Sequence, residues 1–186
     1  MSQNEDLDFT KTLAKPIPAP SLQELESASH EAAVGGQHLR QNGFYVAIAR
    51  RASAKVPPRN GEAYSLLVID DDPDLGNLLA DIFVDAGFEV RRARNRVEIN
   101  AEVNKPLLPD LILLDITLPD ADGLQILARM RANAKFARMP IILMTGRSEA
   151  ADVKAGLAAG ADGYVSKPFK VSALVTAVNL VLGRGA

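Results

Sequence analysis

The sequence of 186 residues predicts an α/β domain with a parallel β-sheet over its last two thirds. Three observations support this fold class. Five short apolar runs follow Ser65, and each is followed by a segment whose apolar residues recur at helical spacing. Such an alternation of strands and helices gives a parallel sheet with right-handed crossovers. Acidic and other polar side chains come directly after several of the apolar runs, where ligands bind in sheets of this class.

The five predicted strands differ in polarity. The run LILLD is continuously apolar, which is typical of a strand buried on both faces of the sheet. The run FEVRRA is more polar and suits a strand at the edge of the sheet. The strands are expected at residues 65–69, 88–93, 111–115, 141–145 and 163–167.

Five helices are predicted between and after the strands. The first has an apolar face and ends at Gly87, and Asp72 before Pro73 has the order expected of an N-cap and the first helical residue. The last helix is apolar around much of its girth. The helices are expected at residues 74–87, 96–105, 123–133, 149–160 and 170–183.

Residues 1–64 form an N-terminal extension of different composition, with Pro-rich stretches typical of linkers. We expect it to be largely unstructured or loosely docked, with a helix at residues 21–41 behind a capping box. The apolar run at 44–49 fits a strand, a docking segment or more helix. His30 and His38 are interpreted as surface histidines rather than as a phosphotransfer site.

Composition excludes several classes of protein. The net charge of −2 argues against a nucleic-acid surface as the main partner. The absence of cysteine excludes disulfides and thiolate metal sites. No stretch approaches the roughly 18 uninterrupted apolar residues of a membrane span. A cytoplasmic protein without membrane insertion is therefore expected, also because the first residues show no secretory signal.

Acidic side chains, one hydroxyl and one ammonium group come at the carboxyl ends of four predicted strands. These residues are Asp70, Asp71, Asp72, Asp115, Thr145 and Lys167. Each alone has an ordinary structural explanation, such as helix capping, strand propensity or a solvated surface. Their occurrence together is what indicates a site.

Converging carboxylates repel one another, and a bound cation removes that cost. An all-oxygen set of ligands suits a hard ion such as Mg²⁺ or Mn²⁺, which keeps several waters and often binds phosphate oxygens. A carboxylate can itself accept a phosphoryl group, while a metal and a lysine neutralise the oxygens of the transferred group. The pattern therefore predicts Mg²⁺-dependent phosphoryl transfer.

The blocks LLVIDDDP, LILLDITLPDADGLQIL, IILMTG and AGADGYVSKPF resemble the receiver domain of bacterial response regulators. The resemblance covers about residues 65–183, so a receiver domain is expected at residues 65–186, with a doubly wound, flavodoxin-like five-stranded sheet of order 2-1-3-4-5. It also implies a phosphorylatable receiver of a two-component phosphorelay, which is not itself classed as an enzyme.

The resemblance implies a role for each matching residue. Asp115 would be the phosphoacceptor, and Thr145, Lys167 and Tyr164 would bind the phosphoryl group and switch the surface. Pro168 would follow a cis peptide bond and fix a turn that aims Lys167 inward. The metal ligands would be Asp70, Asp71, Asp115 and the backbone carbonyl of Thr117.

Partners also follow from the resemblance. The phosphoryl group would come from a sensor histidine kinase or a histidine phosphotransfer protein, and the switched surface would contact a downstream protein target. Because no output domain follows in the sequence, we expect a single-domain regulator. The oligomeric state stays open, with a phosphorylation-dependent dimer as one option.

Two alternatives remain. An aspartate-nucleophile phosphatase would use similar Asp, Lys and Mg²⁺ chemistry, but it needs a second aspartate two residues after the nucleophile, where this chain has Thr117. A phosphorylation-independent interaction module would need none of these groups, although all of them are present.

Overall fold

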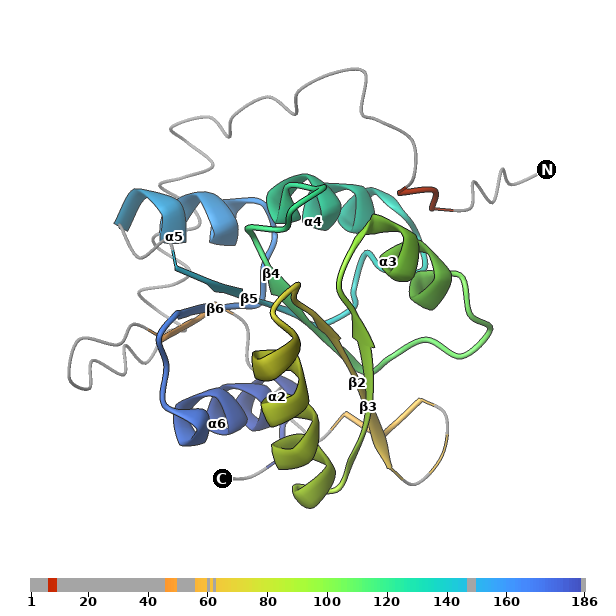
Figure 1. Cartoon of the computed structure of the whole chain (residues 1–186), viewed down its shortest axis with the longest axis vertical. Coiled ribbons are helices and arrows are strands. Elements are labelled where there is room, and N and C mark those ends of the chain that lie inside the picture. The colour runs from red at the N-terminus through yellow and green to blue at the C-terminus, as the bar shows by residue number, and fades with distance from the viewer. Residues whose placement is uncertain are drawn as a thin grey trace.

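The computed structural model describes residues 7–9, 46–49, 56–59, 61, 63–146 and 150–184. Its centre is a six-stranded sheet of order β1-β6-β5-β4-β2-β3 (Figure 1). The strands are β1 Val46–Ile48, β2 Tyr64–Ile69, β3 Phe88–Ala93, β4 Leu111–Asp115, β5 Ile141–Thr145 and β6 Gly163–Ser166. β2 to β6 run parallel. Their order across the sheet, β3-β2-β4-β5-β6, is the predicted order 2-1-3-4-5 when these strands are counted from β2.

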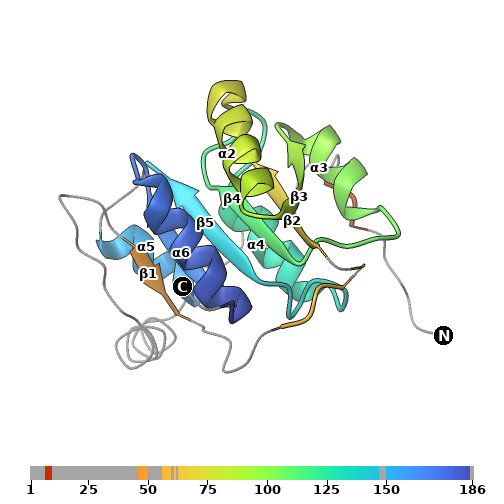
Figure 2. The same ribbon diagram turned by 90° about the horizontal axis from the view of Figure 1, so that it is seen from below.

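Among the described residues, five helices cover the two faces of the sheet in two layers (Figures 1 and 2). One layer holds α2 and α6, and the other holds α3, α4 and α5. Their bounds are α2 Pro73–Asp85, α3 Arg96–Val103, α4 Gly123–Ala132, α5 Ala150–Ala158 and α6 Val171–Leu182. Every helix lies within two residues of its predicted position.

The strands next to the centre are buried on both faces, as their apolar runs predicted. In β4, Leu111 and Leu113 pack toward α2 and α6, whereas Ile112 and Leu114 pack toward the other helical layer. All five residues of β4 are buried. The more polar β3 forms one edge of the sheet, as expected from its sequence.

The N-terminal extension contributes a strand to the sheet. β1 pairs antiparallel with β6, and Val46 stands opposite Val165 while Ile48 stands opposite Gly163. Val46 and Ile48 are buried in the cluster that includes α6, which explains how α6 can be apolar around so much of its girth. Of the three alternatives for residues 44–49, the strand is therefore realised at residues 46–48. The predicted helix at 21–41 and both histidines lie outside the described residues.

Candidate functional site

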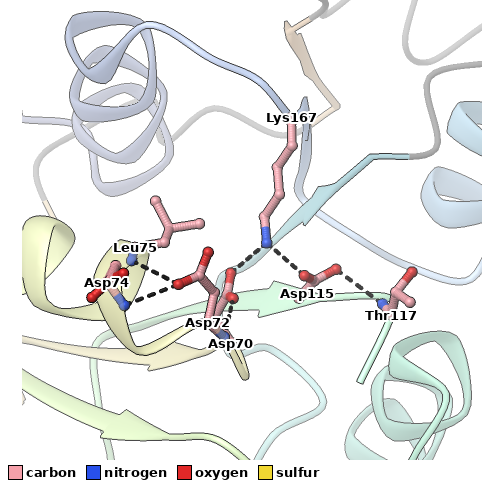
Figure 3. A network of polar contacts seen from close by, with 7 residues as sticks. All are labelled: Asp70, Asp72, Asp74, Leu75, Asp115, Thr117 and Lys167. Atoms are coloured by element: carbon pink, nitrogen blue, oxygen red, sulfur yellow. Dashed lines mark hydrogen bonds and ion pairs between the residues drawn. The ribbon is translucent and has the colours of Figure 1, made fainter. Parts of the chain in front are cut away.

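Parallel strands present their carboxyl ends at the same edge of the sheet, and Figure 3 shows Asp70, Asp115 and Lys167 converging there. Asp70 directly follows β2, and Asp115 is the last residue of β4. Thr145 is the last residue of β5, and Lys167 directly follows β6. The fold thus brings together side chains that are up to 97 positions apart in the chain.

Lys167 joins the two buried carboxylates of the site. Its Nζ atom lies 2.6 Å from Oδ2 of Asp70 and 2.5 Å from Oδ2 of Asp115. Asp70 is 3% exposed and Asp115 is 5% exposed. The ammonium group therefore balances negative charge that has little access to water.

The second oxygen of each carboxylate is held by a backbone amide. Oδ1 of Asp70 accepts a hydrogen bond from the N–H of Asp72 at 3.1 Å. Oδ1 of Asp115 accepts one from the N–H of Thr117 at 2.9 Å. Each carboxylate is therefore fixed in orientation from two sides, by the ammonium and by the loop that follows its strand.

Asp70, Asp71 and Asp115 form an acidic cluster. One carboxylate oxygen from each lies within 4.8 Å of the others, with Asp71 on the exposed side. Three carboxylates with no nitrogen or sulfur ligand are a donor set suited to Mg²⁺ or a similar hard cation. These residues therefore fit the predicted metal, and the open side at Asp71 leaves room for water.

Burial and the ion pairs have opposing effects on the pKa values. Burial raises the pKa of Asp70 above its usual range, although its hydrogen bond and attraction to Lys167 act against this. Burial alone would lower the pKa of Lys167, but its hydrogen bonds to Asp115 and Asp70 outweigh that effect and raise it. Lys167 therefore carries its charge throughout the physiological range.

Thr145 and Tyr164 lie on the neighbouring strands β5 and β6. Both side chains are fully buried, at 0% exposure. The N–H of Lys167 donates to the Thr145 carbonyl at 2.7 Å, which ties the end of β5 to the residue after β6. Tyr164 packs toward α5, where a Cβ atom on Gly156 would lie 3.1 Å from its ring. The Lys167–Pro168 bond is cis, as expected.

Asp72 has a separate, structural role. It is the N-cap of α2, and its Oδ1 accepts hydrogen bonds from the N–H groups of Asp74 at 2.9 Å and Leu75 at 3.2 Å. Pro73 takes the first helical position. The three adjacent aspartates therefore divide as predicted, with two in the acidic cluster and one at the helix terminus.

Two buried aspartates outside the site were missed by sequence reasoning. Asp110 accepts from the N–H groups of Arg59 and Ser65, at 2.7 and 2.8 Å. Asp162 accepts from the N–H of Ile141 at 2.8 Å and from Nη2 of Arg131 at 2.9 Å. Each of these aspartates directly precedes a strand. Backbone N–H groups near the start of a strand need hydrogen-bond partners, so a carboxylate at this position was the available signal of an anchoring role.

Comparison with known families identifies the class of protein. The sequence model of a protein family, described as the response regulator receiver domain, matches residues 66–179 of this chain. The chain therefore belongs to the response regulator receiver family, and its acidic cluster lies where the fold places the site of that family.

Two curated relatives are named as a response regulator and as a transcriptional regulator. The DNA-binding response regulator MtrA of Mycolicibacterium smegmatis is 37% identical over 64% of this chain and 50% of its own length. The DNA-binding dual master transcriptional regulator RpaA of Synechocystis is 34% identical over 64% of this chain and 49% of its own length. The chain thus spans about half the length of these relatives.

Solved structures agree with the fold. The receiver domain of the Francisella response regulator 1452 is 26% identical with a TM-score of 0.60, over 65% of this chain and 98% of that one. The chemotaxis protein CheY4 of Vibrio cholerae is 26% identical with a TM-score of 0.60, over 64% of this chain and 98% of that one. In the part of the chain that the structure describes, no helix has the length and apolar character needed to cross a membrane.

Proposed function

We propose that this receiver domain accepts a phosphoryl group on Asp115 in a Mg²⁺-dependent reaction. The observation that carries the proposal is the position of Lys167, whose ammonium group bridges Asp115 and Asp70 beside the acidic cluster. A carboxylate oxygen of Asp115 would form the new bond to phosphorus while the bond between phosphorus and the donor breaks. The donor would be a phosphohistidine, since a receiver domain implies a histidine kinase as partner.

The remaining residues would stabilise the transferred group. Mg²⁺, when bound by Asp70, Asp71, Asp115 and the carbonyl of Thr117, would supply positive charge to the phosphoryl oxygens. Lys167 would exchange part of its contact with Asp115 for a phosphoryl oxygen. The Thr145 hydroxyl would donate a hydrogen bond to another phosphoryl oxygen.

Phosphorylation would then change the surface formed by α5, β6 and α6. The phosphoryl group would carry about two negative charges, and because Asp115 would lose its own carboxylate charge, the net gain would be about one negative charge placed further into the site. We propose that Thr145, Lys167 and Tyr164 have two alternative packings. The phosphoryl group would shift the population from one packing to the other only through contacts that differ between the two. We propose that a downstream protein reads this surface, and that the chain works as a protein-contact regulator or a phosphorelay intermediate.

The test is incubation with acetyl phosphate and Mg²⁺, followed by intact-protein mass spectrometry. The wild-type chain should gain one phosphoryl group that hydroxylamine removes, and it should gain none when EDTA replaces Mg²⁺. Asp115→Asn should gain none, whereas Asp81→Asn, an exposed aspartate on α2, should behave as wild type. Equal labelling of wild type and Asp115→Asn would contradict the assignment. No labelling at all would favour a phosphorylation-independent interaction module.

A further inference from the structure

A short piece of the N-terminal extension, residues 7–9, lies against α3 and α4 (Figures 1 and 2). Its two apolar side chains are buried, with Leu7 at 9% and Phe9 at 1% exposure. They belong to the same apolar cluster as Ile99 of α3 and Ile126 of α4. The segment is therefore docked in a groove between the two helices, far along the chain from either of them.

Side chains of α3 and its C-cap bind the main chain of this segment. Oδ1 of Asn100 accepts a hydrogen bond from the N–H of Phe9 at 3.2 Å. Nδ2 of Asn104 donates to the carbonyl of Leu7 at 2.9 Å. Two asparagines one turn apart thus hold the amide and the carbonyl at opposite ends of the segment.

Two arginines bind the other carbonyls. Nε of Arg96 donates to the carbonyl of Phe9 at 2.5 Å, and Nη2 of Arg129 donates to the carbonyl of Asp8 at 2.7 Å. The Arg129 guanidinium also lies 4.9 Å from the centre of the Phe9 ring, in a cation–π contact. All three carbonyls of the segment are therefore bound by side chains from the helices.

This combination has the chemistry of a peptide-binding site. Main-chain hydrogen bonds hold any extended peptide, while the two buried positions select for a Leu-x-Phe spacing. Arg96 and Arg129 bind carbonyl groups that any extended peptide offers, and the carboxylates of Asp120 and Asp122 line the neighbouring cavity. A cavity of about 290 Å³, lined by Phe9, both arginines and the start of α4, extends the groove beyond the segment.

We propose that the α3–α4 groove is a binding site for short Leu-x-Phe peptides, and that residues 7–9 of the same chain are its reversible ligand. The described contact involves three residues, and because the segment and the groove belong to the same chain, binding is intramolecular, with an effective concentration on the order of millimolar. A competing peptide must reach that concentration to displace it. The inference does not depend on phosphoryl transfer.

The sequence contains no tryptophan, so Phe9→Trp in the full chain introduces a single fluorescent reporter. Its emission should be blue-shifted and protected from acrylamide, as expected for a buried indole. An excess of a synthetic peptide with the sequence of residues 1–14 should move the emission to longer wavelength, with half the effect at about millimolar concentration. The same peptide with alanine in place of Phe9 should have no effect.

Matched variants test the contacts. Arg129→Ala in the Phe9→Trp chain should expose the indole, because it removes one hydrogen bond and the cation–π contact. Arg138→Ala, an exposed arginine outside the groove, should leave the emission unchanged. Emission that depends on protein concentration would show that a second copy provides the ligand and would overturn the proposal of binding within one chain.

Two other results would overturn the proposal. An exposed indole in the Phe9→Trp chain, together with an unprotected Phe9 amide in hydrogen exchange of the wild-type chain, would show that the segment is not docked. A buried indole that does not respond to several millimolar peptide would show that the segment is a fixed part of the core. If the segment is docked as proposed, Asn100→Ala in the wild-type chain should speed hydrogen exchange of the Phe9 amide, because it removes the acceptor of that N–H.

Discussion

Lys167 and Asp115 form the closest ion pair of the described site, with 2.5 Å between Nζ and Oδ2. The same ammonium group contacts Asp70, so that one positive charge balances two buried carboxylates. Removing this charge leaves the carboxylates to repel each other with little access to water. The pair is therefore a determinant of stability as well as a candidate for phosphoryl binding.

Lys167→Met should lower the free energy of unfolding by about 2 kcal/mol in the absence of divalent metal, a value reduced for the partial exposure of the lysine. Saturating Mg²⁺ should recover much of the loss, because the metal supplies positive charge to the same carboxylates. Denaturant unfolding with and without Mg²⁺ measures both effects. Lys154→Met, an exposed lysine on α5, should change stability by less than about 0.5 kcal/mol. Equal stability of Lys167→Met and wild type would contradict the role.

The stabilisation from Lys167 should depend on pH with a defined sign. The pKa of Lys167 is raised above the ordinary 10.5 in the folded chain, so its full stabilisation of the folded state is present below pH 10.5. It is lost as pH rises through the higher folded pKa. The stability difference between wild type and Lys167→Met, measured without metal, should therefore be constant from about pH 7 to 9 and decrease above pH 10.5. A difference that already decreases below pH 9 would indicate a lowered pKa.

Asp71 and Asp72 should be separable by mutation, because one belongs to the acidic cluster and the other caps α2. Asp71→Asn should strongly weaken Mg²⁺ binding, measured by calorimetry, with little effect on stability. Asp72→Ala should lower stability by about 1 kcal/mol and leave Mg²⁺ affinity nearly unchanged. Asp72→Asn keeps the cap and serves as control. Equal losses of Mg²⁺ affinity in Asp71→Asn and Asp72→Ala would contradict the assignment of Asp71 to the metal site and of Asp72 to the helix cap.

Gly123 should not tolerate a side chain, because α4 begins directly against the backbone at the end of β4. A Cβ atom there would lie 2.3 Å from the carbonyl oxygen of Asp115 and 2.6 Å from Cα of Ile116. Gly123→Ala should therefore destabilise the chain by about 1–3 kcal/mol and slow phosphorylation. Gly76→Ala in α2 has only ordinary contacts, the nearest at 3.7 Å, and should stabilise by roughly 0.5–1 kcal/mol. Thermal melts that rank the two variants in the opposite order would refute this.

Asp162 should be among the most important residues for stability outside the site. It is 4% exposed and binds the N–H of Ile141 and the guanidinium of Arg131. Asp162→Ala would leave that N–H without its partner and should cost about 3 kcal/mol in denaturant unfolding. Asp81→Ala, at an exposed position of α2, is the control and should change stability by less than about 0.5 kcal/mol. A small effect of Asp162→Ala would mean that water replaces the carboxylate.

The sequence predicted the receiver fold well because hydrophobic periodicity and the strand ends carry strong local signals. β3, β4 and β5 have the predicted bounds, and Asp72 is the predicted cap. The convergence of Asp70, Asp115 and Lys167 also followed from the rule that parallel strands end at the same edge. These features depend on residue type and order, which the sequence states directly.

Other features depend on contacts between distant segments, for which a single sequence has no local signal. Phe9 fits between α3 and α4 only once both helices are in place, and neither its spacing nor its neighbours identify that groove. The three-residue β1 is too short to show an alternating pattern, so its partner could not be inferred. Asp110 and Asp162 each stand directly before a strand, which is a local signal, but the distant N–H groups of Ser65 and Ile141 that they bind could not be identified from that position.

The pairing of β1 with β6 also has a consequence for the order of events during synthesis. β1 precedes every other described strand in the chain, yet its partner β6 is the last of the described strands. On the ribosome, Val46 and Ile48 must therefore wait for nearly the whole domain before their apolar side chains can be buried. During that interval these two apolar side chains of the nascent chain stay exposed to solvent. Such transient exposure of apolar residues favours aggregation, which chaperones or fast translation would limit.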